Sequence, residues 1–210
     1  MSPPTPAASR RPNVNAVSNA PEIRTRGINH IALVCKDMAR TVDFYTRVLG
    51  MPLVKTVELP MDQGQHFFFD CGGGATIAFF NFPGAPDAVP GVSIPEGLPD
   101  RASLLTALGS MNHLAFAVQP EEMEGFREHL IAEGLEVTDV WNHDDSEWGL
   151  ARSADDPGVF VRSVYFRDPD GILLEFAAWT RALTPADVRH EPLGARSPHA
   201  TAVRSSQATA

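Results

Sequence analysis

The chain has 210 residues, is 43% hydrophobic and carries a formal net charge of −9. This hydrophobic content can bury a substantial core, and the acidic balance gives no electrostatic reason to bind nucleic acid or anionic lipid. No apolar run approaches the ~20 residues of a membrane-spanning helix, and the first residues lack the apolar segment of a secretory signal. Two cysteines are too few for a disulfide scaffold. The composition therefore indicates a cytoplasmic protein with neither a nucleic-acid nor a membrane partner.

The two ends of the chain lack apolar periodicity. Residues 1–23 are rich in Pro, Ala, Ser and Asn, which is typical of a disordered arm. Residues 182–210 have the same character, apart from a short helix expected at "LTPADV". There Thr184 would be the N-cap and Pro185 the first helical residue.

The first part of the core predicts a strand, a helix and three further strands, in that order. Residues 28–34 alternate as in a strand. The segment "DMARTVDFYTRVLG" has apolar residues at helical spacing between Asp37, a suitable cap, and Gly50, a stop signal. Three strand-like segments follow, at 53–59, 66–71 and 75–82. Residues 27–83 are therefore expected to form one βαβββ module.

The same order repeats after a linker rich in Pro and Gly. This linker covers 84–109, with a short helix expected over 100–108. A strand at 111–118, a helix in "PEEMEGFREHLIAEG" and three further strands follow, at 135–141, 160–167 and 172–179. Residues 110–181 thus form a second βαβββ module. Because each module leaves one sheet face to bury, the repeat predicts an α+β fold of paired, curved mixed sheets around a central cavity.

A histidine stands at the same place in the opening strand of each module. His30 lies in "GINHIALVC" and His113 lies in "SMNHLAFAV". Because side chains alternate along a strand, each histidine shares its face with small residues, which leave space for a ligand. Equivalent positions in a repeat are expected to face one cavity.

Glu175 is the carboxylate that best complements the two histidines. It lies in the middle of the apolar strand of "DPDGILLEFAAW", where a carboxylate is costly to bury unless it is paired or ligated. Two histidines and one carboxylate leave open positions on a metal and suit Fe(II), although Mn(II), Zn(II) or Ni(II) could also bind. The repeat places Ala78 opposite Glu175 in the first module, so we expect three protein ligands and no fourth.

The opening "NHIALVC.DM..TVDFY...LGM" and the closing "YFRDPDG..LE" resemble the vicinal oxygen chelate superfamily. This superfamily includes glyoxalase I, extradiol dioxygenases, fosfomycin-resistance enzymes and bleomycin-binding proteins, and the resemblance covers about 27–180. It implies paired βαβββ modules, a small-molecule substrate and a divalent metal held by His30, His113 and Glu175. The modules could pair within one chain or across a homodimer.

The resemblance also bears on the reaction. Glyoxalase I usually has a glutamate ligand where this chain has Ala78, which favours an extradiol dioxygenase with Fe(II). Tyr165 stands ten residues before Glu175, as in extradiol enzymes, and would hydrogen-bond a substrate oxygen. The acid–base histidines that those enzymes usually carry are missing from "CGGGA" and "DDPGVFVRS". His66 and His143 are the remaining candidates to move protons.

Three functions are therefore open at this point. The first is an Fe(II) extradiol-type dioxygenase acting on a small aromatic or enolisable substrate. The second is a glyoxalase-like lyase or isomerase that uses its metal as a Lewis acid. The third is a non-catalytic protein that binds a small molecule between its modules. Residues 142–158 are expected to form either a lid over the cavity or a solvated insertion.

Overall fold

The computed structural model describes residues 25–194 of the chain. Residues 25–182 form one compact unit, and the described residues 183–194 belong to a second unit. In this second segment a 3-10 turn at Pro185–Asp187 is capped by Thr184, as predicted. The disorder predicted for 1–23 and for the end of the chain concerns residues that are mostly outside the described part.

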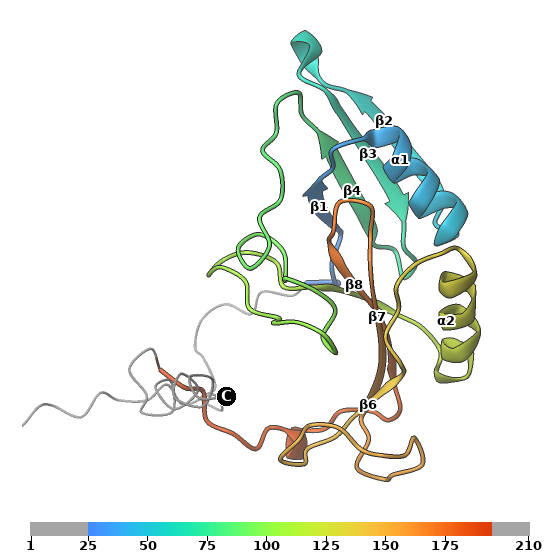
Figure 1. Cartoon of the computed structure of the whole chain (residues 1–210), viewed down its shortest axis with the longest axis vertical. Helices are drawn as coiled ribbons and strands as arrows, with labels where there is room; N and C mark the ends of the chain where they lie inside the picture. The colour runs from blue at the N-terminus through green and yellow to red at the C-terminus, as the bar shows by residue number, and fades with distance from the viewer. Residues whose placement is uncertain (1–24, 195–210) are drawn as a thin grey trace, which may run out of the picture. The chain divides into compact units, whose positions relative to one another are not determined.

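The first module has the predicted βαβββ order (Figure 1). Its elements are β1 (His30–Val34), α1 (Met38–Asp43) with a following π-helical turn (Phe44–Val48), β2 (Leu53–Glu58), a 3-10 turn (Pro60–Asp62), β3 (Gln65–Asp70) and β4 (Thr76–Asn81). Asp37 caps α1 by accepting a hydrogen bond from the Arg40 N–H. The sheet order is β1-β4-β3-β2, and only the β1–β4 pair is parallel.

The second module repeats this arrangement. Its elements are β5 (Leu114–Ala117), a 3-10 turn (Pro120–Glu122), α2 (Met123–Ala132), β6 (Trp141–His143), β7 (Val161–Arg167) and β8 (Leu173–Trp179). The sheet order is β5-β8-β7-β6, again with one parallel pair, β5–β8. Ala32 pairs with Ala78 in the first sheet, and Ala115 pairs with Glu175 in the second. Ala78 and Glu175 therefore occupy equivalent positions, and the predicted α+β fold of two βαβββ modules is confirmed.

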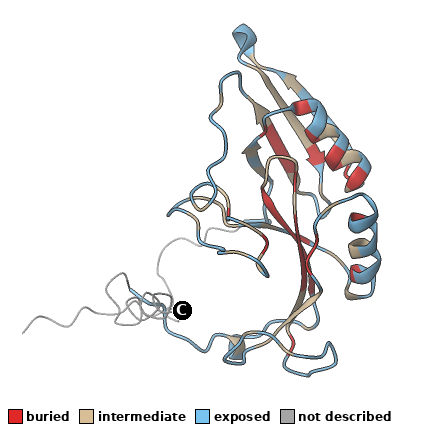
Figure 2. Cartoon of the chain, in the orientation of Figure 1, coloured by how far each residue is buried: buried red, intermediate tan, exposed pale blue. Residues whose placement is uncertain are grey.

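One hydrophobic core joins the two modules on the side of the sheets that carries the helices. Figures 1 and 2 show α1 and α2 along the same side of the unit, with buried residues between helices and strands. The largest buried side chains of this core come from both modules: Tyr45, Phe69, Phe79, Met123, Leu130 and Phe166. The opposite sheet faces, called the open faces below, carry His30 and His113, which are exposed together with the small residues beside them. Tyr165 and Glu175 on the open face of the second sheet are buried.

Polar contacts also join the modules on the helix side. The Tyr45 hydroxyl donates to Asp168 Oδ2 at 3.3 Å, and His129 Nε2 donates to the Val48 carbonyl at 2.9 Å. Asp168 is almost completely buried, and burial raises the pKa of its carboxyl to about 7. Among the described residues, β1 and β5 belong to separate sheets and no ladder joins them. The modules of one chain therefore meet through their helices and core, and not through their open faces.

The helix predicted over 100–108 is replaced by turns. The N–H groups of Arg101 and Ala102 both bond the Leu98 carbonyl, and the helix goes no further. The reason is that the next backbone groups have distant partners: the Leu104 carbonyl accepts from the Asn112 side chain, and the Ala107 N–H donates to Val92. A helix would need those groups for its own bonds.

The strand predicted over 135–141 is also different, because β6 begins only at Trp141. Thr138 explains the delay. The Thr138 carbonyl accepts a hydrogen bond from Arg127 Nε at 2.8 Å. The Tyr165 N–H therefore donates to the Thr138 hydroxyl, at 3.0 Å, and not to the Thr138 carbonyl. A side chain thus interrupts the regular backbone ladder along β7.

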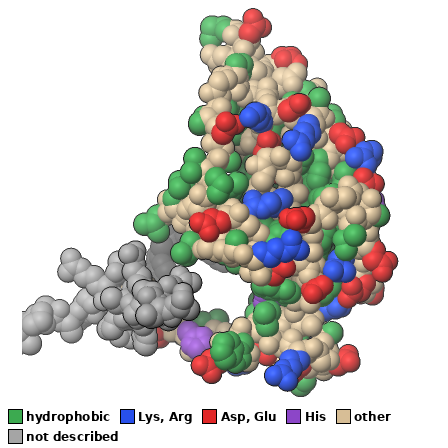
Figure 3. All heavy atoms as spheres, viewed as in Figure 1, with side chains coloured by type: hydrophobic (Ala, Val, Ile, Leu, Met, Phe, Trp, Pro, Cys, Tyr) green, Lys and Arg blue, Asp and Glu red, His purple; other side chains and the backbone are tan. Residues whose placement is uncertain are grey.

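The helices of the described part are short, and its surface carries charges of both signs. None of the helices in residues 25–194 has the length and hydrophobicity needed to cross a bilayer. On the face in Figure 3, acidic and basic side chains are interspersed over α1 and α2.

Candidate metal centre

Two of the three predicted metal ligands lie together on the open face of the second sheet. His113 immediately precedes β5, and Glu175 is in the middle of the neighbouring strand β8 with only 6% of its surface exposed. His113 Nε2 is 3.0 Å from Glu175 Oε2. Burial by itself would raise the pKa of the Glu175 carboxyl, but the contact with His113 lowers it, and the net pKa lies below the usual value.

Each candidate histidine ligand is oriented by the asparagine before it. His113 Nδ1 is 2.8 Å from Asn112 Oδ1, and His30 Nδ1 is 2.8 Å from Asn29 Oδ1. An amide oxygen only accepts hydrogen bonds, so each Nδ1 carries a proton and a neutral ring has its lone pair on Nε2.

This tautomer places two electron-rich atoms face to face. The Nε2 lone pair of His113 and the Glu175 carboxylate oxygen are both acceptors, so a contact of 3.0 Å requires a proton or a cation shared between them. Imidazole nitrogen and carboxylate oxygen are also the donors that first-row divalent metals use. The pair therefore fits a divalent metal.

His30 is not part of this pair. It lies in β1 of the first sheet, on the exposed face, where its ring contacts Phe68 edge to face with 5.8 Å between ring centres. Within residues 25–194, no three His, Cys, Asp or Glu side chains come close enough together to hold a metal. The structure thus brings His113 and Glu175 together in one chain and leaves His30 on the other module.

Tyr165 and His143 lie beside the His113–Glu175 pair. Tyr165 is directly opposite Glu175 in the β7–β8 ladder, and its hydroxyl is 3.4 Å from His143 Nε2 on β6. Burial, followed by the charge of Glu175, raises the pKa of Tyr165 to about 12. Burial lowers the pKa of His143, and this effect exceeds the opposing effect of Glu175. At neutral pH the site therefore offers a protonated phenol as donor and a neutral imidazole as acceptor.

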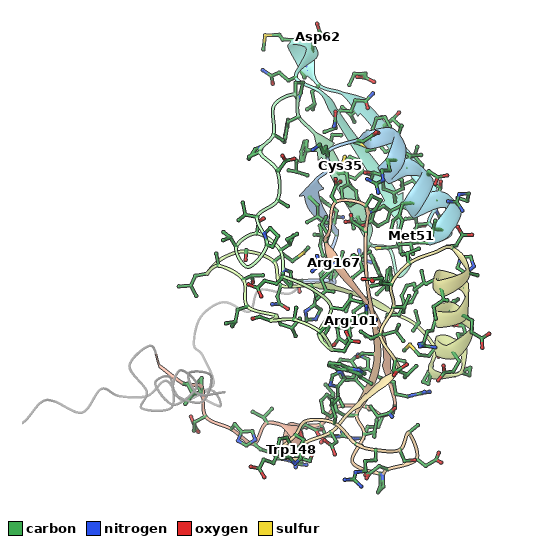
Figure 4. All side chains as sticks on the ribbon, viewed as in Figure 1. Cys35, Met51, Asp62, Arg101, Trp148 and Arg167 are labelled. Atoms are coloured by element: carbon green, nitrogen blue, oxygen red, sulfur yellow. The ribbon has the colours of Figure 1, made fainter. Side chains whose placement is uncertain are left out.

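The linker covers this part of the second sheet. Leu98 is buried against Tyr165 and Leu173, with Trp141 packed beside them. The loop after β6 carries Trp148, which is 85% exposed at the lower end of the view in Figure 4. The predicted lid role of residues 142–158 stays a prediction, and the apolar cover that the structure shows comes from the linker.

His66 lies on the open face of the first sheet, and the structure does not bring it together with Tyr165 or His143. Its ring is stacked on Phe80 at 3.6 Å between ring centres, and its Nδ1 is 3.2 Å from the Phe79 carbonyl. Phe68 and Phe82 extend this row of rings on the same face. An acid–base role for His66 stays a prediction.

Sequence reasoning missed three features of the two open faces. The asparagines that orient the histidines, Asn29 and Asn112, could have been found from the "NH" repeated in both opening strands. The aromatic row could have been found by applying strict alternation to "HFFFD" and "AFFNF", since Phe69 and Phe79 enter the core while Phe68 and Phe80 do not. Ser163, a buried hydroxyl beside Tyr165, gives no signal in the sequence.

The fold and site define a class of protein with two βαβββ modules, each opened by a histidine. Comparisons with known proteins agree with this class. A model of the Glyoxalase/Bleomycin resistance protein/Dioxygenase superfamily matches residues 27–176. The chain belongs to this superfamily, which confirms the resemblance to the vicinal oxygen chelate proteins.

Individual relatives are distant. The metallothiol transferase FosB of Shouchella clausii (strain KSM-K16) is 28% identical over 156 residues, which are 74% of this chain and 82% of that protein. A glyoxylase/bleomycin resistance protein/dioxygenase domain from Frankia sp. EAN1pec has a TM-score of 0.54 at 19% identity, covering 74% of this chain and 99% of that one. A glyoxalase family protein from Enterococcus faecalis has a TM-score of 0.50 at 23% identity, with coverages of 72% and 97%. The structural matches support the fold alone.

Proposed function

We propose that the chain is a metal-dependent enzyme that binds two neighbouring oxygens of a small aromatic or enolisable substrate, and that it acts as an Fe(II) extradiol-type dioxygenase. The observation that carries this proposal is the contact between His113 and Glu175 beside a protonated phenol and a neutral imidazole. A bound divalent metal would supply Lewis acidity toward the substrate oxygens, and Fe(II) would add redox chemistry with dioxygen.

The roles of the protein side chains follow from their protonation states. Tyr165, whose pKa is raised to about 12, stays protonated and can donate a hydrogen bond to a substrate oxygen. His143, whose pKa is lowered by burial, stays neutral and can accept a proton from a substrate hydroxyl at Nε2. Leu98 and Trp141 pack on the Tyr165 ring and keep water from that side.

The guanidinium of Arg167, near Tyr165, is already hydrogen-bonded within the protein. Arg167 is on the same strand face as Tyr165, since it is two residues further along β7. Its guanidinium donates to the carbonyls of Gly171 and Pro95, so it is already used by the protein. This supports a substrate held through its oxygens at the metal.

A homodimer would complete the site. In one chain His30 and His113 are exposed, and strands β1 and β5 each have one edge that pairs with no other strand of the described chain. An open face and a free edge are surfaces that a second copy can cover. We propose that His30 of the partner subunit joins His113 and Glu175, so that each of two sites draws on both chains.

Metal analysis of protein purified without oxygen tests the enzyme proposal. We expect stoichiometric iron, oxygen consumption with catechols, and loss of both in His113→Ala. Ser110→Ala is the control, since this hydroxyl bonds only Ala107 locally. Full metal content in His113→Ala would refute the ligand set.

Mixing two inactive variants tests the shared site. His30→Ala and Glu175→Ala would each be inactive alone, because each homodimer carries the defect in both sites. After the two are unfolded and refolded together, mixed dimers would contain one intact site, which restores about a quarter of wild-type activity in an equal mixture. No recovery in mixtures that demonstrably contain mixed dimers would place the site within one chain.

A glyoxalase-like lyase or isomerase is the second candidate. The match to FosB favours it, because that relative is a metallothiol transferase and not an oxygenase. The same residues would act, with the metal as Lewis acid only. Turnover that continues without oxygen and with a redox-inert metal such as Zn(II) would select this function.

A further inference from the structure

Ser163 is an anomaly in the second sheet. It lies on β7, opposite Ala177 of β8 and Trp141 of β6, and none of its surface is exposed. Its hydroxyl is the one buried side-chain polar atom in residues 25–194 that has no hydrogen-bond partner. Buried hydroxyls are normally bonded, so one without a partner calls for an explanation.

The surroundings of Ser163 show what this hydroxyl can reach. Alternation along β7 places it on the same face as Tyr165, and Glu175 is the neighbour of Tyr165 on β8. Burial raises the pKa of Glu175, whereas His113 and, after it, Ser163 lower this pKa. Burial also raises the pKa of Tyr165, and Ser163 opposes that rise. Because Ser163 is fully buried, a substrate cannot touch it, and any functional effect must pass through these neighbours.

We infer that Ser163 is a positioning residue whose hydroxyl donates to the Glu175 carboxylate and turns it toward the metal. A carboxylate is a stronger acceptor than a phenol, which favours Glu175 over Tyr165 as its partner. In the structure Glu175 Oε2 faces His113, and the Ser163 hydroxyl has no hydrogen-bond partner. Hydrogen bonds from such supporting residues fix the orientation of metal ligands. This inference rests on the proposed metal-dependent function.

Mn(II) binding to the full chain tests the inference without an enzyme assay. The EPR signal of free Mn(II) gives the dissociation constant for wild type, Ser163→Ala, Ser163→Thr and the control Ser110→Ala. We expect Ser163→Ala to bind about tenfold or more weakly, as other supporting groups of metal ligands do. Ser163→Thr keeps the hydroxyl and should restore binding, and Ser110→Ala should match wild type.

Thermal unfolding of the metal-free proteins separates positioning from a structural role. Removing an unbonded hydroxyl should leave the Tm of Ser163→Ala unchanged or higher, while its Mn(II) affinity falls. Wild-type affinity in Ser163→Ala would overturn the inference and leave the proposed function standing. Failure of the wild type to bind any divalent metal would overturn both.

Discussion

Replacing Tyr45 by phenylalanine would test how the two modules are held together. The Tyr45 side chain has no exposed surface, and its hydroxyl donates to Asp168 Oδ2 at 3.3 Å. The other carboxylate oxygen, Oδ1, accepts the N–H groups of Asp170 at 2.9 Å and Ile172 at 2.8 Å. The substitution removes one oxygen atom, keeps the ring in the core, and deprives a buried carboxyl of one donor.

The size of the effect depends on the charge of Asp168. The pKa of this carboxyl is about 7, well above the usual 3.8, because burial disfavours the charged form. Below pH 6 the group is neutral, and losing a neutral hydrogen bond costs about 1 kcal/mol. Above pH 8 the group is charged, and losing a bond to a charge costs about 1.5–3 kcal/mol.

The same sign follows from proton linkage. Because the folded pKa of Asp168 lies above the unfolded value, its contribution to stability is fully present below about pH 4 and is lost as the pH rises through about 7. Tyr45 lowers this pKa by donating to the carboxylate, so Tyr45→Phe would raise it further. Each additional pKa unit removes about 1.4 kcal/mol of stability above pH 8.

Urea unfolding at pH 5 and pH 8.5 measures both penalties. The chain has two tyrosines, so Tyr165→Phe is a matched control. Its hydroxyl lies at a long 3.4 Å from His143 Nε2, and we expect a cost below about 1 kcal/mol at both pH values. A penalty for Tyr45→Phe that is the same at both pH values would refute this account of Asp168.

Three further changes separate catalysis, metal binding and stability. Tyr165→Phe removes the donor to the substrate and should lower kcat/KM about 100-fold with little change in Tm, as steady-state kinetics and thermal unfolding would show. Asn112→Ala frees the His113 ring and should weaken Mn(II) binding about tenfold by the EPR titration; an unchanged affinity would mean that the asparagine does not orient the ligand. Arg127→Ala leaves the Thr138 carbonyl without its donor and should cost about 1–3 kcal/mol in urea unfolding, whereas a wild-type midpoint would show that water replaces the guanidinium.

The sequence could predict those features that depend on local pattern and on the repeat. Alternation assigned His30 and Glu175 to the open faces, and the repeat aligned Glu175 with Ala78, as the strand register shows. Side chains that replace backbone partners could not be predicted. Thr138, through its contact with Arg127, delays the start of the expected strand, and Asn112 takes the Leu104 carbonyl that a helix would have used. Such contacts join residues distant in sequence, so no local window contains them.

The placement of His30 shows a second limit of sequence reasoning. A repeat establishes that His30 and His113 are equivalent, but it does not say which copies of the two modules face each other. The structure answers part of this question, because the modules of one chain share a core on the helix side and are tied by Tyr45 and Asp168. That packing leaves His30 and His113 exposed on the two open faces. A complete ligand set then requires either a different arrangement of the modules or a second chain.

The two modules have also diverged in a way that fits a shared site. The second sheet carries the carboxylate, the phenol and the neutral imidazole, whereas the first has Ala78 in place of the carboxylate and a row of aromatic rings beside His30. The proposed ligand set has three members, and the described residues of one chain bring together only His113 and Glu175. An aromatic face alone could hold a flat substrate but could not activate it. The proposed function therefore depends on bringing a first module against a second one, and under this proposal subunit pairing is part of the chemistry.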